Sequence, residues 1–182
     1  GWFPSVSAGW RVSEENFMRP VTWVNSLKLR ASFGITGNDN IPENASSNGY
    51  GPSNYSFGDG SDVTPGLAIS SKTKGNPDIT WEQTYEWNAG VDASRFKSSV
   101  NIGFDAYYSI TDRLLLEVPM PSFSGFLHQW DNVGKVRNMG IEIGVETRNI
   151  RRKNFEWNSN FVFSLNRNKV VELNGEYQIV NY

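Results

Sequence analysis

Residues 139–168 alternate between apolar and polar side chains with unusual persistence. The apolar positions begin with Met139, Ile141, Ile143 and Val145, and they resume after a basic break at Phe155, Trp157, Phe161, Phe163 and Leu165. A period of two predicts β-strands, because successive side chains of a strand point to opposite faces of the sheet. The period alone does not say which face meets which solvent. Half-buried strands of soluble proteins and lipid-facing strands of membrane barrels both alternate.

The same alternation recurs in other parts of the chain. In residues 27–37, for example, the apolar side chains from Leu27 to Ile35 oppose a polar set from Lys28 to Thr36. Six extended segments are predicted in this way: 3–12, 27–37, 81–95, 100–118, 139–150 and 155–170. Most reach the nine to eleven residues that a tilted strand needs to cross a bilayer. Strands of soluble sandwiches typically run to about five or six residues.

The connections between these segments alternate between short and long. "FKSS" at 96–99 and "RRKN" at 151–154 predict tight antiparallel hairpins. Residues 37–80 and 119–138 form long connections rich in Gly, Pro, Asn, Asp and Ser. Short turns on one side and long loops on the other are typical of outer-membrane barrels. The pattern therefore predicts an all-β fold, an antiparallel transmembrane β-barrel segment with short periplasmic turns and long extracellular loops. A soluble β-sandwich that binds glycans through Trp81, Trp87 or Trp130 is the alternative.

Composition excludes several other classes. The formal net charge is -2 with acids and bases interspersed, so no nucleic-acid partner is expected. Cysteine is absent, which removes disulfides and thiolate metal sites. No apolar run approaches the roughly 18 residues of a membrane helix, and the mean hydropathy is -0.48. Aromatic residues make up 14%, which fits either a β-rich core or two interfacial girdles. In a barrel, Trp81 and Tyr85 would lie near the outer rim, and Phe96, Phe155 and Trp157 near the periplasmic rim.

Five stretches, in register along nearly the whole chain, resemble one family. They are "FPSVSAGWRVSEENFM" at 3–18, "TGN" at 36–38, "GNPDITWEQTYEWNAGVD" at 75–92, "NVGKVRNMGIEI" at 132–143 and "FEWNSNFVFSLNRNKVVEL" at 155–173. Together they resemble the C-terminal barrel of the SusC/RagA family of TonB-dependent outer-membrane transporters. No single stretch is diagnostic, but the five in order are specific.

The resemblance implies a barrel of roughly 22 strands, of which this chain supplies about six. It implies a location in the outer membrane of a Gram-negative bacterium. Family members import oligosaccharides or peptides with a SusD-like surface lipoprotein as lid, and draw energy through the TonB complex. We expect the plug domain and the TonB box to lie outside this sequence. The resemblance also implies that the chain is not an enzyme and needs no cofactor.

Two sets of residues are candidates for function. In a barrel the apolar set meets lipid, because an Arg or Lys at the lipid midplane costs about 2 to 4 kcal/mol. The charged residues would then point into the lumen: Lys28, Arg30, Glu82, Glu86, Asp92, Asp105, Glu142, Glu146 and Arg148. Aromatic residues of the long loops are candidates for ligand contact, because such rings stack on sugars or peptide side chains: Tyr50, Tyr55, Phe126 and Trp130.

Catalysis has little support in the sequence. The single histidine, His128, lies near Ser124 and Asp131, but a triad is defined by geometry and not by proximity along the chain. A carboxylate pair for glycoside hydrolysis could come from Glu82, Glu86, Glu142 or Glu146. We expect these acids to serve as lumen charges, with no enzymatic activity and no metal site.

Overall fold

The structure is a computed structural model that describes residues 2–43, 45–57, 62–69, 73–96 and 98–173. The chain divides into two compact units. The first contains residues 1–37, 84–111 and 136–170, and the second contains residues 38–83, 112–135 and 171–182. In the described part of the chain, no helix is long and apolar enough to cross a membrane.

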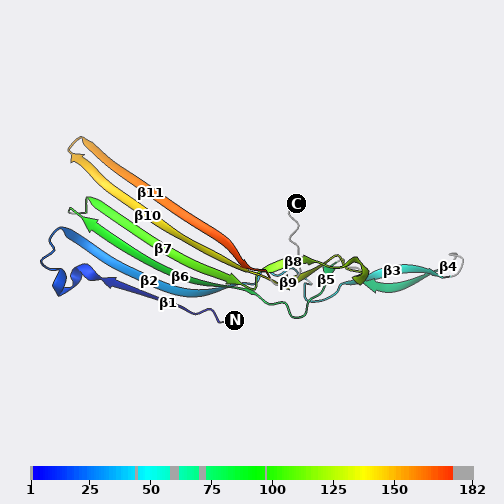
Figure 1. Ribbon diagram of the computed structural model, residues 1–182. Helices are drawn as coiled ribbons and strands as arrows, with labels where there is room; N and C mark the ends of the chain where they lie inside the picture. The colour runs from blue at the N-terminus through cyan, green and yellow to red at the C-terminus, as the bar shows by residue number, and fades with distance from the viewer. Residues whose placement is uncertain (1, 44, 58–61, 70–72, 97, 174–182) are drawn as a thin grey trace. The chain divides into compact units, whose positions relative to one another are not determined.

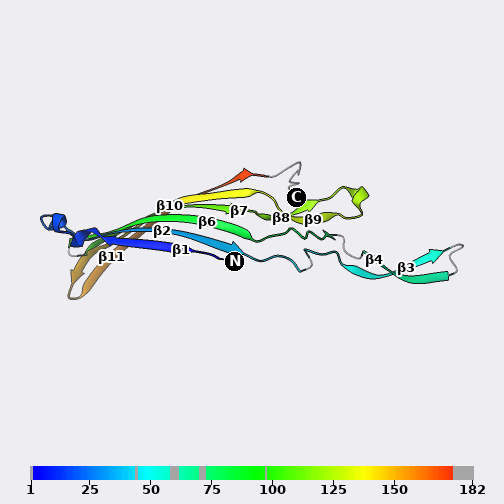
Figure 2. The same cartoon turned by 90° about the horizontal axis from the view of Figure 1, so that it is seen from below.

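The first unit is built on one six-stranded sheet. Its strands lie side by side in the order β1-β2-β6-β7-β10-β11, so each strand is next to its predecessor among these six (Figure 1). Their bounds are β1 (Ser5–Arg11), β2 (Val24–Asn38), β6 (Glu82–Arg95), β7 (Val100–Asp112), β10 (Lys135–Arg152) and β11 (Phe155–Glu172). Seen from below, the six strands form one twisted layer (Figure 2). The six segments predicted from alternation correspond to these six strands.

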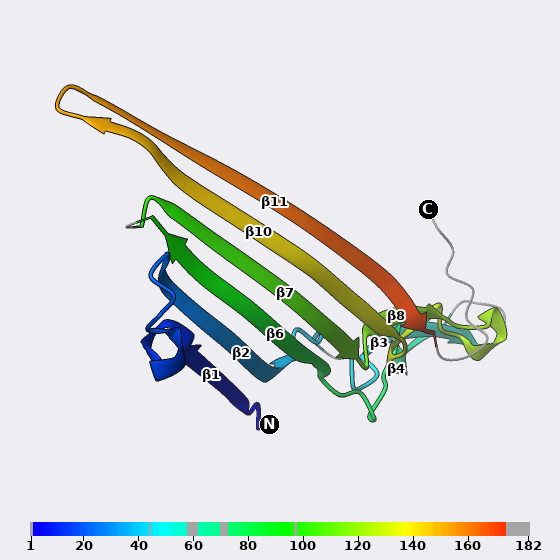
Figure 3. The same cartoon turned by 60° about the vertical axis from the view of Figure 1, so that its left-hand side comes forward.

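Short connections join the strands at one end of the sheet. A tight turn links β6 to β7, and both Phe96 (φ 53°) and Ser98 (φ 60°) take left-handed backbone conformations there. Lys153 and Asn154 link β10 to β11. Two 3-10 turns, η1 (Val12–Glu14) and η2 (Asn16–Met18), lie between β1 and β2. The β10–β11 hairpin extends beyond the β6–β7 turn (Figure 3). The two predicted hairpins are therefore present.

The strand pairing brings like residues together on each face. Antiparallel β1 and β2 oppose Val6 to Phe33 and Ala8 to Ala31, so apolar side chains face apolar side chains across the two strands. Rings from three neighbouring strands continue this face, since Phe33 lies 5.2 Å from Trp87 and Trp87 lies 5.8 Å from Tyr108 between ring centroids. The sheet therefore has one apolar face, as the alternation predicts.

That apolar face has no hydrophobic core over it. The buried hydrophobic residues in the described part of the chain are Val12, Ala45, Val118 and Val133, and none lies in the six strands. Large apolar side chains of the strands are exposed instead: Val6, Trp10, Leu29, Trp87, Ile102, Phe104, Tyr108, Phe155, Trp157, Phe161, Phe163 and Leu165. A soluble sandwich would bury this face against a second sheet. An uncovered apolar face of this kind is typical of a barrel wall that contacts lipid.

One predicted segment is wrong in its extent. Residues 100–118 were expected to form one strand, but β7 ends at Asp112 and a separate strand, β8 (Leu115–Pro119), follows. Arg113 breaks the strand because its φ is 57°, in the left-handed region. The Leu115 N–H then donates a hydrogen bond to the carboxylate of Glu82 at 2.9 Å.

The second unit contains strands that the loop composition did not predict. β3 (Tyr50–Phe57) pairs antiparallel with β4 (Asp62–Ile69). β9 (His128–Asn132) pairs antiparallel with β8 and parallel with β5 (Thr73–Lys74), so residues from both long connections share one small sheet. η3 (Ser122–Ser124) lies between β8 and β9.

Candidate functional site

An ionic cluster lies across three neighbouring strands of the six-stranded sheet. Arg30 on β2 places its Nε 2.8 Å from Asp92 Oδ2 on β6, and its Nη2 3.1 Å from Asp105 Oδ2 on β7. Its Nη2 also donates a hydrogen bond to Asp92 Oδ1 at 3.1 Å. All three side chains are about one-third to one-half exposed, so water screens the cluster only in part. The cluster has one positive and two negative charges.

A glycine makes room for this cluster. Gly90 is buried on β6, and a Cβ there would lie 2.5 Å from Asp105 Oδ1 and 2.8 Å from Arg30 Nη2. Any side chain at this position would displace the ion pair. The requirement is for space, because the guanidinium of Arg30 lies directly over the backbone at Gly90.

On the face of the sheet that carries this cluster, Tyr107 of β7 covers Gly140 of β10. A Cβ on Gly140 would lie 2.5 Å from the Tyr107 hydroxyl oxygen and 2.6 Å from the carbonyl oxygen of Leu165. An aromatic ring laid over a cross-strand glycine compensates for the missing side chain and holds the strands in register. The polar set therefore contains packed positions as well as charges.

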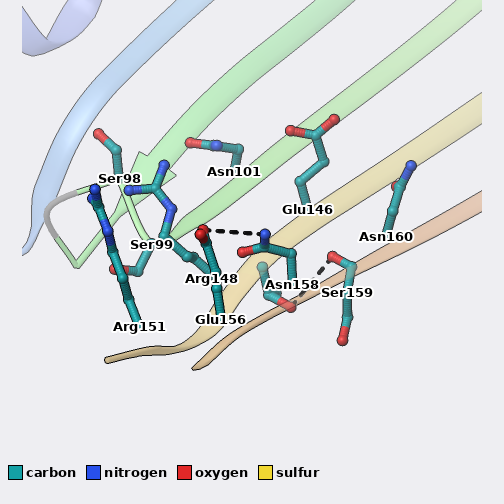
Figure 4. Close-up of a pocket in the computed structure, with 11 residues that line it drawn as sticks. Ser98, Ser99, Asn101, Glu146, Arg148, Arg151, Glu156, Asn158, Ser159 and Asn160 are labelled. Atoms are coloured by element: carbon teal, nitrogen blue, oxygen red, sulfur yellow. Dashed lines mark hydrogen bonds between the residues drawn. The ribbon is translucent and has the colours of Figure 1, made fainter. Parts of the chain in front are cut away.

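A polar pocket of about 540 Å³ lies at the turn end of β7, β10 and β11. Figure 4 shows the guanidinium groups of Arg148 and Arg151 toward Ser98, and the carboxylate of Glu146 on the opposite side of the pocket. Asn158 donates a hydrogen bond to Glu156 at 3.3 Å, and the Thr147 hydroxyl donates to the carbonyl oxygen of Ser159 at 3.4 Å.

The remaining lining of this pocket is also polar and includes Ser99, Asn101 and Asn160. Charges of both signs and several amides suit a hydrated polar ligand.

The structure brings together some of the predicted lumen charges. Arg30, Asp92 and Asp105 form the ionic cluster, and Glu146 and Arg148 line the polar pocket. Glu82 belongs to the second unit and accepts hydrogen bonds from Asn38 Nδ2 and from the backbone of Leu115, both at 2.9 Å. Three further predicted lumen charges belong neither to the ionic cluster nor to the lining of the polar pocket: Lys28, Glu86 and Glu142. Their contact with a lumen stays a prediction.

The candidate ligand-contact residues lie in the second unit. Tyr50 begins β3 and is 67% exposed, whereas Phe126 and Trp130 are half-buried. Tyr55 lies opposite Thr64 in the β3–β4 ladder. Among the described side chains, no ring contact joins Tyr50, Phe126 and Trp130. Their role in binding therefore stays a prediction.

The residues near the single histidine do not assemble a triad. The Ser124 hydroxyl bonds the backbone of Phe126, and Asp131 Oδ1 accepts from Asn76 Nδ2 and from the backbone of Asn132. No hydrogen bond between described residues joins either side chain to His128. Likewise, the described residues contain no group of three potential metal ligands.

Two asparagines outside the predicted site residues hold the second unit together. Asn76 is buried, and its side chain bonds the carbonyl of Trp130 and the backbone N–H of Asp78. Asn132 Oδ1 accepts from the Thr80 N–H at 2.6 Å, and its Nδ2 donates to the carbonyls of Thr80 and Arg113 at 2.7 and 2.9 Å. Asn76 lies between Gly75 and Pro77, and Asn132 lies between Asp131 and Val133. Nothing in these neighbours identifies the hydrogen-bond partners of either asparagine.

We expect Asn132→Ala to loosen the second unit while leaving the six-stranded sheet folded. The substitution leaves the Thr80 and Arg113 carbonyls and the Thr80 N–H without their partner, at about 1–3 kcal/mol for each group that stays buried. Limited proteolysis of the whole protein should show faster cleavage within 38–83 and 112–135. His128→Ala, on the same strand, is the control and should cleave at the wild-type rate. Equal rates for both variants would contradict the role of Asn132.

Comparison with known proteins identifies the family of this fold. The family model described as "TonB dependent receptor-like, beta-barrel" matches residues 1–180. TonB-dependent receptor P39 of Formosa agariphila is 40% identical over 176 residues, which cover 97% of this chain and 16% of that protein. TonB-dependent receptor SusC of Bacteroides thetaiotaomicron is 34% identical over 96% of this chain and 18% of its own length. The chain therefore spans under a fifth of these relatives.

Solved structures agree with the sequence relatives. The RagAB peptide importer in its open-open state superposes with a TM-score of 0.83 and 30% identity, covering 96% of this chain and 18% of that chain. Its closed-closed state gives a TM-score of 0.81. The predicted family, the β-barrel fold class and the outer-membrane localisation in a Gram-negative bacterium are confirmed, and the soluble-sandwich alternative is wrong. The chain belongs to the TonB-dependent receptor β-barrel family, together with SusC and the RagAB importer.

Proposed function

We propose that this chain forms part of the barrel wall and outer loops of a TonB-dependent importer. The whole protein would take up oligosaccharides or peptides with a SusD-like lipoprotein as lid and the TonB complex as energy source. The observation that carries this proposal is the difference between the two faces of the six-stranded sheet. One face has exposed apolar side chains, and the other carries the ionic cluster of Arg30, Asp92 and Asp105. A match to the family along residues 1–180 supports it.

We also propose how the chain lies in the membrane. The apolar face meets lipid, and the lumen charges face the aqueous interior. The short turns lie on the periplasmic side, and the connections 37–80 and 119–138 lie outside the cell. Tyr50, Tyr55, Phe126 and Trp130 then become candidates for contact with substrate or lid. The known relatives are receptors and transporters, and we infer that this chain likewise has no enzymatic activity.

The whole protein containing this chain provides the test. Expressed in a Gram-negative host, it should sediment with the outer membrane, require detergent for extraction and co-purify with a SusD-like lipoprotein encoded beside it. Uptake of labelled oligosaccharides or peptides should depend on TonB. Recovery of the protein in the soluble fraction without detergent would overturn the proposal, and so would uptake that is unchanged without TonB.

Neighbouring positions on β10 test which face meets lipid. The chain has no cysteine, so single cysteines can be placed at Glu142 and Ile143 without competing thiols from this region. A spin label at Ile143→Cys should collide mainly with oxygen, which concentrates in lipid. A label at Glu142→Cys should collide mainly with a water-soluble nickel chelate, because neighbouring residues of a strand face opposite sides. Reversed accessibilities would contradict the proposed face assignment.

A further inference from the structure

Arg95 lies on the apolar face of the sheet, at its turn end. Arg95 is the last residue of β6, and it shares the face of Trp87, Ala89, Val91 and Ala93 because it follows them at intervals of two. A cation at this edge of a lipid-facing surface lies where headgroups and acyl chains meet. Its position is set by the strand and not by a flexible loop.

Two aromatic rings hold this arginine. The guanidinium carbon of Arg95 lies 4.3 Å from the ring centroid of Trp23 and 4.9 Å from that of Phe96. These distances are within the range of cation–π attraction. Trp23 and Phe96 are themselves 56% and 61% exposed, so the group lies at the surface of the sheet. Rings therefore fix the guanidinium by packing.

The positive charge of Arg95 has no carboxylate partner among the described residues. Its Nε is enclosed and has no hydrogen-bond partner in the described part of the chain. An arginine whose planar surface packs on rings still presents the N–H groups along its edge, and these match the paired oxygens of a phosphate. A charge without a carboxylate partner favours an anion that approaches from the interface.

An apolar hollow of about 610 Å³ lies on the same face. Four alanines of β1, β2, β6 and β7 form much of it, with Phe33, Trp87 and Tyr108 beside them. Ala89 is six residues from Arg95, about 20 Å along the strand. For a strand tilted by about 45° this is roughly 14 Å of depth, near the midplane of a hydrocarbon core about 30 Å thick. An acyl chain anchored at Arg95 reaches this depth.

We propose that Arg95, Trp23 and Phe96 bind the phosphate of one glycerophospholipid, and that one of its acyl chains lies in the alanine hollow. The proposal rests on the placement of the apolar face in lipid, and it adds a defined lipid site to the importer. The lipid belongs to the leaflet on the turn side of the sheet. Arg95 supplies charge and hydrogen bonds, while the small side chains of the hollow supply room for the chain.

Lipid titration of the whole protein in mild detergent, followed by native mass spectrometry, tests the phosphate contact. Arg95→Gln should weaken binding of dioleoylphosphatidylethanolamine by about fivefold or more, because the charge-assisted bonds to phosphate are lost. Arg152→Gln, at the exposed end of β10, is the matched control and should bind as the wild type does. Dioleoylglycerol, which lacks the phosphate, should bind weakly and equally to all three proteins. Wild-type affinity in Arg95→Gln would overturn the proposal.

A second variant tests the hollow. Ala89→Trp fills it and should weaken binding of the dioleoyl lipid but leave binding of dihexanoylphosphatidylethanolamine unchanged, because the short chains do not reach Ala89. Displacement of the lipid by millimolar inorganic phosphate would assign Arg95 to a free anion and overturn the lipid site. Substrate uptake and outer-membrane sedimentation should stay normal in both variants. If the wild-type protein itself did not sediment with the outer membrane or take up substrate, the proposed importer would be contradicted, and not the lipid site.

Discussion

Gly140→Ala should destabilise the barrel by about 1–3 kcal/mol, a large effect for a single methyl group. The added Cβ would lie 2.5 Å from the Tyr107 hydroxyl oxygen and 2.6 Å from the carbonyl oxygen of Leu165. The tyrosine can rotate away, but the carbonyl belongs to the neighbouring strand β11. Relief therefore requires the β10–β11 pairing to shift. Urea unfolding of the whole protein in lipid vesicles, followed by tryptophan fluorescence, measures the loss.

Gly144→Ala is the matched control on the same strand and in the same polar set. A Cβ at Gly144 meets nothing within 4 Å. This variant should gain about 0.4–1 kcal/mol, because alanine restricts the unfolded chain more than glycine does. The two substitutions thus have opposite expected signs. Combining Gly140→Ala with Tyr107→Ala should recover only part of the loss, since the clash with Leu165 remains. Equal stability of both single variants would contradict the close packing at Gly140.

Arg30→Met should lower the free energy of unfolding by about 1–2 kcal/mol. It leaves Asp92 and Asp105 without their shared cation. Removing one partner of a fully buried ion pair costs about 3–5 kcal/mol, and the exposure of these side chains to water reduces that figure. The same urea titration measures the effect.

The uncompensated carboxylates, and not the lost packing, should account for most of this cost. Adding Asp92→Asn and Asp105→Asn to Arg30→Met should therefore restore most of the stability. Arg30→Lys should show an intermediate loss, because an ammonium group keeps the charge but cannot bridge two carboxylates with a planar fork. If the triple variant were no more stable than Arg30→Met, the electrostatic explanation would be wrong.

The strands and their faces could be predicted from the sequence because both are local properties. Alternation with a period of two assigns each residue to a face, and it predicts that Arg30, Asp92 and Asp105 all point into the lumen. Register is not local. Which glycine lies under which side chain depends on how two strands align, and neither Gly90 beneath Arg30 nor Gly140 beneath Tyr107 could be identified from alternation.

The long connections were harder to predict for a different reason. Their Gly, Pro, Asn and Ser content predicts loops, yet β3, β4, β5 and β9 form within them. Pairings such as β5 with β9 join residues more than 50 positions apart, which no local pattern reveals. The break at Arg113 depends on the contacts of Glu82 and Gly134 with the residues that follow it. Among the described side chains, Tyr50, Phe126 and Trp130 consequently share no ring contact that supports a common binding role.

The parallel pairing of β5 with β9 has a consequence for how such proteins diversify. It joins the two long connections, and the hydrogen bonds from Asn76 to Trp130 and between Asn132 and Thr80 reinforce the joint. If only one connection were replaced by that of a relative, it would lack its matching partner strand and the asparagine hydrogen bonds in the new protein. Chimeras that exchange 38–83 and 112–135 together should fold where single exchanges fail. The two connections thus belong to one compact unit, although about thirty residues of the six-stranded sheet separate them in the sequence.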